Sequence, residues 1–236
     1  MRNISIIIPA KDEEKRLPGF LRKILDYCRE DKNSYEIIVV DDGSQDHTVQ
    51  VTEAFQRDFS NIKMLSLDRN HGKGYAVKQG FLAAQGEVVL FLDADGSTGP
   101  QEIGRYLSLL DHDCDIVIGS RSLDEGGTSI KARFYRKFMG GIFNFFVSTL
   151  LIKGIKDTQC GFKMFKAPVA KDIFSRVCLE GFGFDLEVLY LAQKMNHRIK
   201  EVPVHWTHVE GSKVHLLKDS LRMFNNIFQI RNRHYD

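Results

Sequence analysis

Short apolar runs alternate with amphipathic stretches along the first half of the chain. Runs rich in Ile, Val and Leu predict strands at residues 4–8, 36–40, 62–67, 88–92 and 115–118. Between them, apolar residues recur every three to four positions, which predicts helices at about 17–25, 49–59 and 76–84. Strands that alternate with helices predict an α/β fold, in which helices cover both faces of a mostly parallel sheet.

The pattern changes after residue 121. A basic apolar stretch is followed by a predicted strand at 159–165, a helix at about 184–195, a strand at 199–206 and a last helix that starts near Lys213. This last helix carries an apolar stripe through Leu221, Phe224 and Phe228, which we expect to pack on the sheet. We therefore interpret the chain as one domain, residues 1–236, with differently built halves at 1–120 and 121–236.

Two carboxylates, the acid pair Asp93 and Asp95, directly follow the run 88–92 and precede Gly96. In open α/β sheets, ligands bind at the carboxyl ends of the strands. Two hard oxygen donors at such an end suit a divalent cation that carries a diphosphate. The alternative is an Asp-Gly turn that caps the next helix. The chemistry at the other strand ends decides between these interpretations.

Acidic residues also follow the first two strands. The first strand ends at Pro9 and Ala10, before the acids 12–14, and the second strand ends in the sequence Asp-Asp-Gly-Ser at 41–44. Carboxylates there can accept hydrogen bonds from a base or a ribose, as they do in dinucleotide-binding folds. The alternative at the second end is a turn followed by a helix cap. We expect Ser44 to form this cap, which leaves Asp42 free for a ligand.

A glycine-rich segment, residues 69–74, follows the third strand and carries Lys73 at the start of a predicted helix. It resembles a phosphate-binding nest at a helix N-terminus, although it has neither the dinucleotide fingerprint nor the Walker spacing. Base-binding acids, a basic glycine loop and a metal-binding pair would then lie along one edge of the sheet. This combination favours a site for a nucleotide diphosphate and a metal ion over four unrelated turns.

Composition narrows the class of protein. Of 236 residues, 43% are hydrophobic and 27% are charged, so the chain can bury a large core and disorder is disfavoured. The net charge of +2 gives no general electrostatic reason to bind nucleic acid. The four cysteines lie far apart, which argues against a zinc site or a disulfide framework and favours a reducing compartment. No signal peptide precedes the first strand, so we expect a cytoplasmic protein.

One apolar stretch, residues 138–152, has Lys and Arg on both flanks. It is shorter than the roughly 20 apolar residues that span a bilayer. It fits either a helix of the core or an interfacial helix that rests on anionic headgroups and buries its apolar side among the acyl chains.

Several motifs of the two halves stand out together. In the first half they are Ser5–Ala10, Val39–Ser44, Gly72–Gly74, Leu92–Gly96 and Gly119–Arg121. These motifs resemble the inverting family-2 glycosyltransferases of the GT-A fold. In the second half, Lys156–Lys163, Phe184–Glu187, Val204–Trp206 and Gly211–Lys213 are similar to the dolichyl-phosphate β-glucosyltransferases, a group of polyprenyl-phosphate sugar synthases. Mannosyl relatives usually have leucine where this chain has Lys73, and an arginine near His208, so these departures favour a glucose donor.

The resemblance implies a GT-A fold with a Rossmann-like nucleotide-sugar half at 1–120 and an acceptor and membrane-surface half at 121–236. It implies an inverting enzyme that moves glucose from UDP-glucose to dolichyl phosphate with Mg²⁺ or Mn²⁺, peripherally associated with the cytoplasmic face of a membrane. Two alternatives stay open: a GDP-mannose-dependent dolichyl-phosphate mannosyltransferase, and a family-2 enzyme with a hydroxyl acceptor. The intact acid pair disfavours a binding protein without turnover. A lipid acceptor favours the interfacial interpretation of residues 131–156.

The resemblance also implies roles for individual residues. The nucleotide sugar would be bound by Pro9, Ala10, Lys11, Glu13, Val40, Asp42, Lys73, Ala94, Ser97 and Arg121. The acid pair Asp93 and Asp95 would hold the metal, with Asp95 as the main ligand. The acceptor and its phosphate would be bound by Arg133, Arg136, Gln159, His208 and Lys213.

The need for a general base depends on the acceptor. A lipid monophosphate has a second pKa of about 6, so it is already a nucleophile at neutral pH. A hydroxyl acceptor would need a base, for which Asp157, Asp185 and Glu187 are candidates. We assign Asp185 and Glu187 to positioning, keep Asp185 as the less favoured base, and leave open that Glu187 pairs with a buried basic group.

Overall fold

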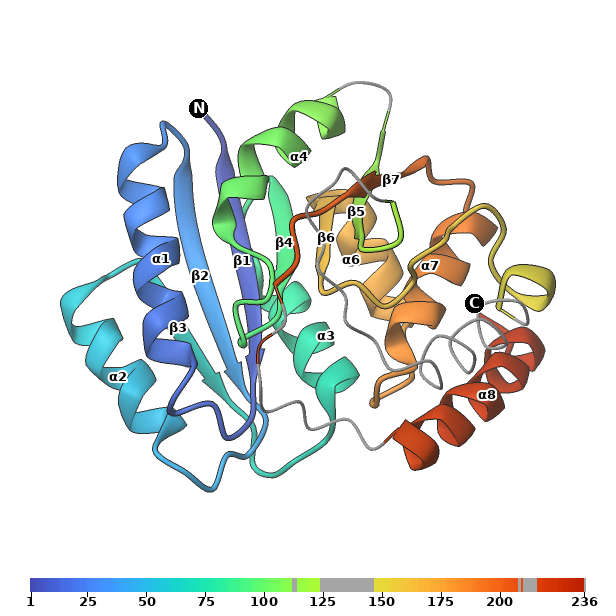
Figure 1. The fold of residues 1–236 in the computed structure, drawn as a ribbon, viewed down its shortest axis with the longest axis horizontal. Helices are drawn as coiled ribbons and strands as arrows, with labels where there is room; N and C mark the ends of the chain where they lie inside the picture. Colours follow the sequence, from blue (N-terminus) through green and yellow to red (C-terminus); the bar gives the residue numbers. More distant parts are fainter. Residues whose placement is uncertain (112–113, 124–146, 208, 210–215, 236) are drawn as a thin grey trace.

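The computed structural model describes residues 1–111, 114–123, 147–207, 209 and 216–235. Within these residues the strands form one seven-stranded sheet in the order β3-β2-β1-β4-β6-β5-β7 (Figure 1). The strands are β1 (Asn3–Ala10), β2 (Ser34–Asp41), β3 (Ile62–Ser66), β4 (Val88–Leu92), β5 (Ile116–Ser120), β6 (Phe162–Lys166) and β7 (Ile199–Pro203).

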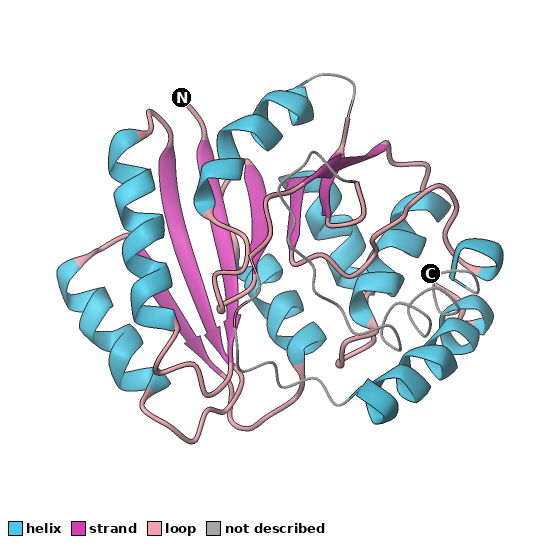
Figure 2. Ribbon diagram, viewed as in Figure 1, coloured by secondary structure: helices cyan, strands magenta, loops and turns pink. Residues whose placement is uncertain are grey.

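Helices cover both faces of this sheet (Figure 2). They are α1 (Leu17–Glu30), α2 (Thr48–Asp58), α3 (Lys73–Ala83), α4 (Ile103–Asp111), α6 (Ala167–Arg176), α7 (Phe184–Lys194) and α8 (Leu216–Asn232), with the 3-10 turn η1 (Pro100–Glu102) before α4. One face is covered by α1, α2 and α4, and the other by α3, α6, α7 and α8. In the described part of the chain, no helix combines the length and the apolar character needed to cross a membrane.

Strand β1 lies inside the sheet because its sequence is apolar on both faces. Ile4, Ile6 and Ile8 belong to the core under α1 and α4, whereas Ile7 belongs to the core under α3 and α6. All four are at most 1% exposed, as expected for a parallel strand with helices on both sides. Strands β3, β2, β1 and β4 are parallel neighbours, so the predicted mostly parallel sheet between helices is confirmed.

One strand of the second half interrupts the parallel order. β6 runs antiparallel to both β4 and β5, so that Phe162 pairs with Leu92 and Met164 pairs with Val117. β5 is in turn parallel to β7. The segment that precedes β6 is thereby placed beside the end of β4, where the acid pair begins.

The predicted helix cap at Ser44 is wrong, because α2 begins only at Thr48. The hydroxyl of Ser44 instead accepts the N–H of Asp12, at 2.8 Å, and so joins the loops after β2 and β1. At the start of α2, the N–H of Thr48 donates to the side-chain Oδ1 of Asp46 at 2.9 Å. Helices α4 and α6 are additions to the predicted set of elements.

The apolar stretch 138–152 falls only partly within the described residues. Its last part packs in the core, since Val147, Leu151 and Ile152 are each at most 9% exposed. Residues 131–146, with the predicted phosphate ligands Arg133 and Arg136, lie outside the described residues. The interfacial interpretation of that part stays a prediction.

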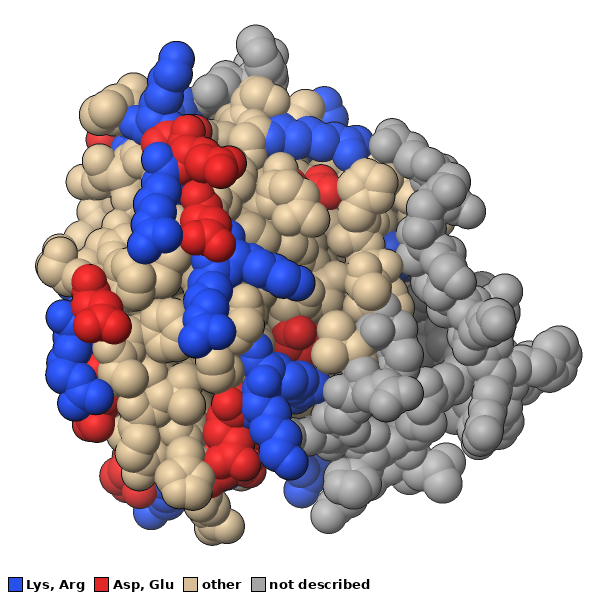
Figure 3. Space-filling model, turned by 60° about the vertical axis from the view of Figure 1, so that its left-hand side comes forward, with Lys and Arg blue, Asp and Glu red and all other residues tan. Residues whose placement is uncertain are grey.

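Charges of both signs are mixed on the surface. On the face shown in Figure 3, Lys and Arg side chains lie among Asp and Glu side chains, and the coloured residues show no broad area of one sign. This mixture agrees with the small net charge of +2.

Candidate functional site

A cavity of about 1000 Å³ opens at the carboxyl ends of β1, β2 and β4. Because these strands are parallel neighbours, the residues that follow them meet at one edge of the sheet. The start of α3 and the loop 179–183 extend this wall, and α8 forms another wall. In Figure 1 the edge lies at the lower end of the sheet, toward which the arrowheads of β1 and β2 point.

The cavity brings together most of the residues predicted for the nucleotide sugar and the metal. They are Pro9, Ala10, Lys11, Glu13, Asp42, Lys73, Asp93, Ala94 and Asp95. The predicted residues that do not line it are Val40, Ser97, Arg121, Gln159 and Asp185. Those outside the described residues are Arg133, Arg136, His208 and Lys213.

Asp42 shapes the cavity beside β2. Its Oδ1 accepts the N–H of His71 at 2.7 Å, and its Oδ2 accepts the N–H of Gly72 at 2.9 Å. Burial raises the pKa of this carboxyl and outweighs the lowering effect of the two hydrogen bonds. Asp42 therefore ties the glycine-rich segment to the end of β2, and this contact places His71, a residue absent from the predicted set, in the cavity wall.

The loop after β1 contributes an acid and two cations. Lys11 Nζ donates to the carbonyl of Gly43 at 2.9 Å. Arg16 holds Glu13 at two points, with Nε 2.6 Å from Oε2 and Nη2 2.5 Å from Oε1. The hydrogen bond to Glu13 raises the pKa of Arg16, and the charges of the acid pair add to this effect. Arg16, which is also absent from the predicted set, lines the cavity as a permanent cation.

Lys73 and Asp93 form an ion pair in the cavity wall. Lys73 Nζ lies 2.6 Å from Asp93 Oδ1, and the two side chains are 23% and 27% exposed. The ammonium group also lies 5.1 Å from the ring centre of Phe91 and 6.0 Å from that of Phe182. Burial lowers the pKa of Lys73, but the nearby carboxylates, Asp93 foremost, outweigh burial and raise it. Lys73 is therefore an ammonium ion at neutral pH.

The glycine loop before α3 does not form the predicted phosphate nest. The N–H groups of Gly74 and Tyr75, at the start of the helix, donate to the carbonyl of Glu180 at 2.7 and 3.2 Å. Glycine is needed here because a Cβ atom on Gly72, whose φ is 109°, would lie 2.5 Å from the same carbonyl oxygen. The nest prediction is wrong for this reason: the helix start binds the chain's own loop, and Lys73 lines the cavity beside it.

The acid pair has the chemistry of a divalent-cation site. Both carboxylates line the cavity, and Asp95 Oδ1 accepts the N–H of Ser97 at 2.9 Å. The described residues contain no group of three or more His, Cys, Asp or Glu side chains that could hold a metal ion by itself. Mg²⁺ and Mn²⁺ accept one or two carboxylates together with phosphate oxygens and water. The acid pair therefore fits an ion that is bound jointly by the protein and a diphosphate.

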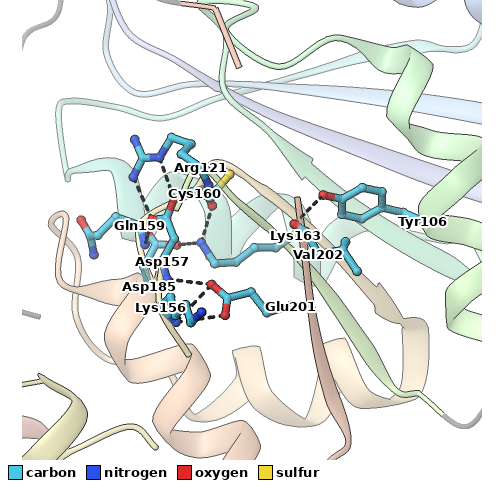
Figure 4. Close-up of polar contacts among 10 residues, drawn as sticks. All are labelled: Tyr106, Arg121, Lys156, Asp157, Gln159, Cys160, Lys163, Asp185, Glu201 and Val202. Atoms are coloured by element: carbon cyan, nitrogen blue, oxygen red, sulfur yellow. Dashed lines mark hydrogen bonds and ion pairs between the residues drawn. The ribbon is translucent and has the colours of Figure 1, made fainter. Parts of the chain in front are cut away.

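A second ion pair lies outside the cavity lining (Figure 4). Lys163 Nζ lies 2.6 Å from Asp185 Oδ1, and these side chains are only 2% and 4% exposed. Lys163 also donates to the carbonyl of Cys160 at 2.5 Å. Burial raises the pKa of Asp185 and outweighs the lowering effect of Lys163. Asp185 is thus enclosed with a lysine and does not line the cavity in which a general base would meet an acceptor.

Arg121 is bound by Asp157 (Figure 4). Its Nε lies 2.8 Å from Oδ2 and its Nη2 lies 2.9 Å from Oδ1. Burial lowers the pKa of Arg121, but the contact with Asp157 outweighs burial, so the pKa of Arg121 is raised. Burial raises the pKa of Asp157, but the contact with Arg121 outweighs burial, so the pKa of Asp157 is lowered. Glu201 supports this pair by accepting the N–H of Asp157 at 2.8 Å. Nearby, Nε2 of Gln159 is buried and has no hydrogen-bond partner among the described residues.

Glu187 organises the loop after α6. The residue is completely buried, and its Oε2 accepts the N–H groups of Cys178 and Leu179 at 2.9 and 2.7 Å. Its Oε1 accepts the hydroxyl of Tyr235 at 2.8 Å and lies 3.6 Å from Nη1 of Arg233. The structure therefore shows both loop positioning and pairing with a basic group, although the side chain of Arg233 is 39% exposed and not buried.

Helix α8 contributes cavity residues that are absent from the predicted set. They are Arg222, Asn225, Asn226 and Gln229. A signal for them exists in the sequence, because these polar positions repeat with the same helical spacing as the apolar stripe on which the prediction of packing was based. That stripe packs only in part: Phe224 is partly buried against the core, whereas Phe228 is 48% exposed.

Comparison with known proteins gives concordant matches. The model of the family "Glycosyl transferase family 2" matches residues 5–174. A dolichyl-phosphate β-glucosyltransferase of Dictyostelium discoideum is 42% identical over 243 residues, which cover 98% of this chain and 74% of that protein. The enzyme of the same name from Homo sapiens is 35% identical over 246 residues, which cover 99% of this chain and 76% of that protein.

A solved structure agrees with the fold. Glucosyl-3-phosphoglycerate synthase from Mycobacterium tuberculosis, in complex with Mn²⁺, UDP-glucose and phosphoglyceric acid, matches with a TM-score of 0.74. The match covers 99% of this chain and 81% of that one at 17% identity. At this level of identity the likeness concerns the fold, which is the GT-A arrangement implied by the strand-end motifs.

Proposed function

Because the chain belongs to glycosyl transferase family 2, and is therefore a glycosyltransferase, we propose that it transfers glucose from UDP-glucose to dolichyl phosphate with inversion at the anomeric carbon. The observation that carries this proposal is the cavity that joins Asp42, Lys73 and the acid pair at one edge of the sheet. Glucose and dolichyl phosphate are proposed from the names that several relatives share.

We assign the part of the cavity formed by the residues that follow β1, β2 and β4 and by the start of α3, the strand-end wall, to binding of the donor. The carboxylates of Asp42 and Glu13 are acceptors for hydrogen bonds from a base or a ribose. Lys73 and Arg16 are cations of the same wall, and they attract the diphosphate. The acid pair would hold Mg²⁺ or Mn²⁺, which when bound offsets the negative charge of the leaving diphosphate.

The acceptor phosphate serves as the nucleophile without a general base. An oxygen of the phosphate forms a bond to the anomeric carbon while the bond from that carbon to the UDP oxygen breaks, and the electron pair leaves with UDP. Attack from the face opposite to UDP inverts the anomeric configuration. The enclosure of Asp185 with Lys163 at 2.6 Å supports a reaction that does not use Asp185 as a base.

We place the protein at the cytoplasmic face of a membrane, because a dolichyl chain keeps its phosphate at the bilayer surface. The support lies in the sequence, where Lys131, Arg133, Arg136 and Lys137 precede an aromatic stretch. This placement can be measured by sedimentation of the protein with anionic and with neutral vesicles. Equal sedimentation with both, or with neither, would remove the electrostatic part of the proposal.

A donor and acceptor matrix tests the function. Purified protein with Mn²⁺ is incubated with labelled UDP-glucose or GDP-mannose, and with dolichyl phosphate or dolichol. We expect an acid-labile lipid product only from UDP-glucose with dolichyl phosphate, in the β configuration by NMR. If product forms with GDP-mannose and not with UDP-glucose, the donor is GDP-mannose. If product forms with dolichol, the acceptor is a hydroxyl group. UDP binding without product from any combination would remove the catalytic proposal.

A further inference from the structure

The wall that α8 contributes to the cavity is polar. Its cavity residues are Arg222, Asn225, Asn226 and Gln229, and their spacing places them on one side of the helix. On the other side, Ile227 and Ile230 are each 1% exposed and belong to the core that includes α7. Figure 1 shows α8 beside α7, with which it is in contact.

Contacts within α8 and just beyond its end hold the helix against its neighbours. Gly183 permits a close approach, because a Cβ atom there would collide with the side-chain amide of Asn226. Just beyond the helix, Arg233 Nη1 and the hydroxyl of Tyr235 lie 3.6 and 2.8 Å from the buried Glu187 Oε1. The polar side of α8 is therefore held as a wall and is not simply a solvated helix face.

The cations of the cavity differ in their partners. Lys11, Arg16 and Lys73, on the strand-end wall, each bind a carbonyl or carboxylate of this chain. Arg222 is exposed, and within the part of the chain that the structure describes it makes no hydrogen bond or ion pair. Among the described residues it therefore brings to the cavity a positive charge that no carboxylate pairs with, on an element separate from the acid pair.

We infer that Arg222 binds the phosphate group of the acceptor, an inference that rests on the proposed function. The donor diphosphate and the acceptor phosphate are both anions that must meet at one carbon atom, so the acceptor needs a cation of its own. A guanidinium group presents paired N–H donors that match two phosphate oxygens. The amides of Asn225 and Gln229 add hydrogen-bond donors on the same wall.

Binding of a soluble prenyl phosphate tests this site without turnover. Farnesyl phosphate is titrated by calorimetry into the protein loaded with Mn²⁺ and UDP, for the wild type, Arg222→Gln and Arg231→Gln. Arg231 is the matched control, because it is an exposed arginine of the same helix that does not line the cavity. We expect Arg222→Gln to weaken binding roughly tenfold or more, and Arg231→Gln to leave it within about twofold.

A second variant makes the test independent of one substitution. Asn225→Asp puts a negative charge on the same exposed side of α8, and we expect it to weaken farnesyl phosphate binding while UDP binding is unchanged. In the transferase assay, both variants should raise KM for dolichyl phosphate and leave KM for UDP-glucose unchanged. Titrations with inorganic phosphate and with farnesol separate the contribution of the phosphate from that of the prenyl chain.

Equal affinity of the wild type and Arg222→Gln for farnesyl phosphate would overturn the inference. No binding of farnesyl phosphate to the wild type would overturn it as well, and so would a loss that affects UDP alone. Failure of the proposed function has a different signature, because the wild type then forms no glucosylated lipid in the assay. The binding comparison still decides in that case whether Arg222 holds a phosphate.

Discussion

Asp93 and Asp95 follow the same strand but have different partners. Asp93 is bound by Lys73 at 2.6 Å, whereas Asp95 accepts a backbone N–H, that of Ser97. A carboxylate bound by an ammonium group shares its charge with that group, so the charge of Asp95 is more available to a metal ion. The geometry thus favours Asp95 as the main ligand of the proposed metal.

We predict that Asp95→Ala lowers the rate of glucose transfer by roughly a thousandfold or more, because the charge stabilisation by a bound metal is lost. The thermal midpoint should change little, since in the described residues the Asp95 side chain makes one hydrogen bond, to the N–H of Ser97. Initial rates and melting curves are measured together. Asp172→Ala is the control, because Asp172 is an acid that is 45% exposed on α6. An active Asp95→Ala protein would remove the metal assignment.

Residue chemistry at the strand ends is predictable because it depends on a few consecutive positions. Asp42 and Lys73 line the cavity for this reason. The state of Arg121 is not predictable in this way, since its partner Asp157 is 36 residues away in the sequence. Whether an arginine is available for a phosphate depends on such a distant contact, and the sequence pattern contains no sign of it.

At the scale of elements, the contact between α3 and the loop after α6 builds one corner of the cavity. Gly74 permits it, because a Cβ atom there would collide with the carbonyl oxygen of Leu179 in that loop and would lie 2.6 Å from the Cβ atom of Phe184 at the start of α7. We predict that Gly74→Ala destabilises the protein by about 1–3 kcal/mol through overpacking, and that it weakens UDP binding. Urea unfolding and calorimetry measure the two effects.

Gly19→Ala is the matched substitution, since Gly19 lies in α1 and a Cβ atom there would meet nothing within 4 Å. It should stabilise the protein by about 0.5–1 kcal/mol, because alanine favours the helix over glycine. If both substitutions had the same sign, close packing would not be the reason for glycine at position 74.

The order of the strands shows what an apolar pattern does not encode. The runs 88–92 and 159–165 are recognisable as strands, but the pattern does not specify which strand each one joins. The antiparallel placement of β6 between β4 and β5 depends on pairing at long range, such as that of Phe162 with Leu92. Helix α4 is absent from the predicted elements, although Ile103 and Tyr106 have helical spacing in the sequence and are completely buried.

At the scale of the whole molecule, Asp115 joins three neighbouring strands of the sheet. Its Oδ2 accepts the N–H of Arg198 at 3.0 Å, before β7, and its Oδ1 lies 3.3 Å from Lys166 Nζ, at the end of β6. Burial raises the pKa of Asp115, but the hydrogen bonds from Arg198 and Lys166 outweigh burial and hold the pKa at about 2. This value is lower than the roughly 3.9 expected in the unfolded chain.

We predict that the charge of Asp115 contributes about 1–2 kcal/mol to the free energy of unfolding at neutral pH. Because the folded pKa is depressed, this contribution is complete above about pH 5 and is lost as the pH falls through about 2. Urea unfolding of the wild type and Asp115→Asn should show a difference that is roughly halved by pH 3. Asp172→Asn, on an exposed helix face, should show a small difference at every pH. A pH-independent gap for Asp115→Asn would contradict the assignment.

The buried Glu187 gives the two chain termini unequal importance for handling the protein. Tyr235, near the C-terminus, donates to the same carboxylate that holds the loop beside the cavity. The other terminus precedes β1 at the edge of the sheet away from the cavity, at the top of Figure 1. A fusion placed directly after residue 236 would disturb the hydrogen bond between Tyr235 and Glu187, on which that loop depends. An affinity tag or a surface attachment is therefore better placed before residue 1.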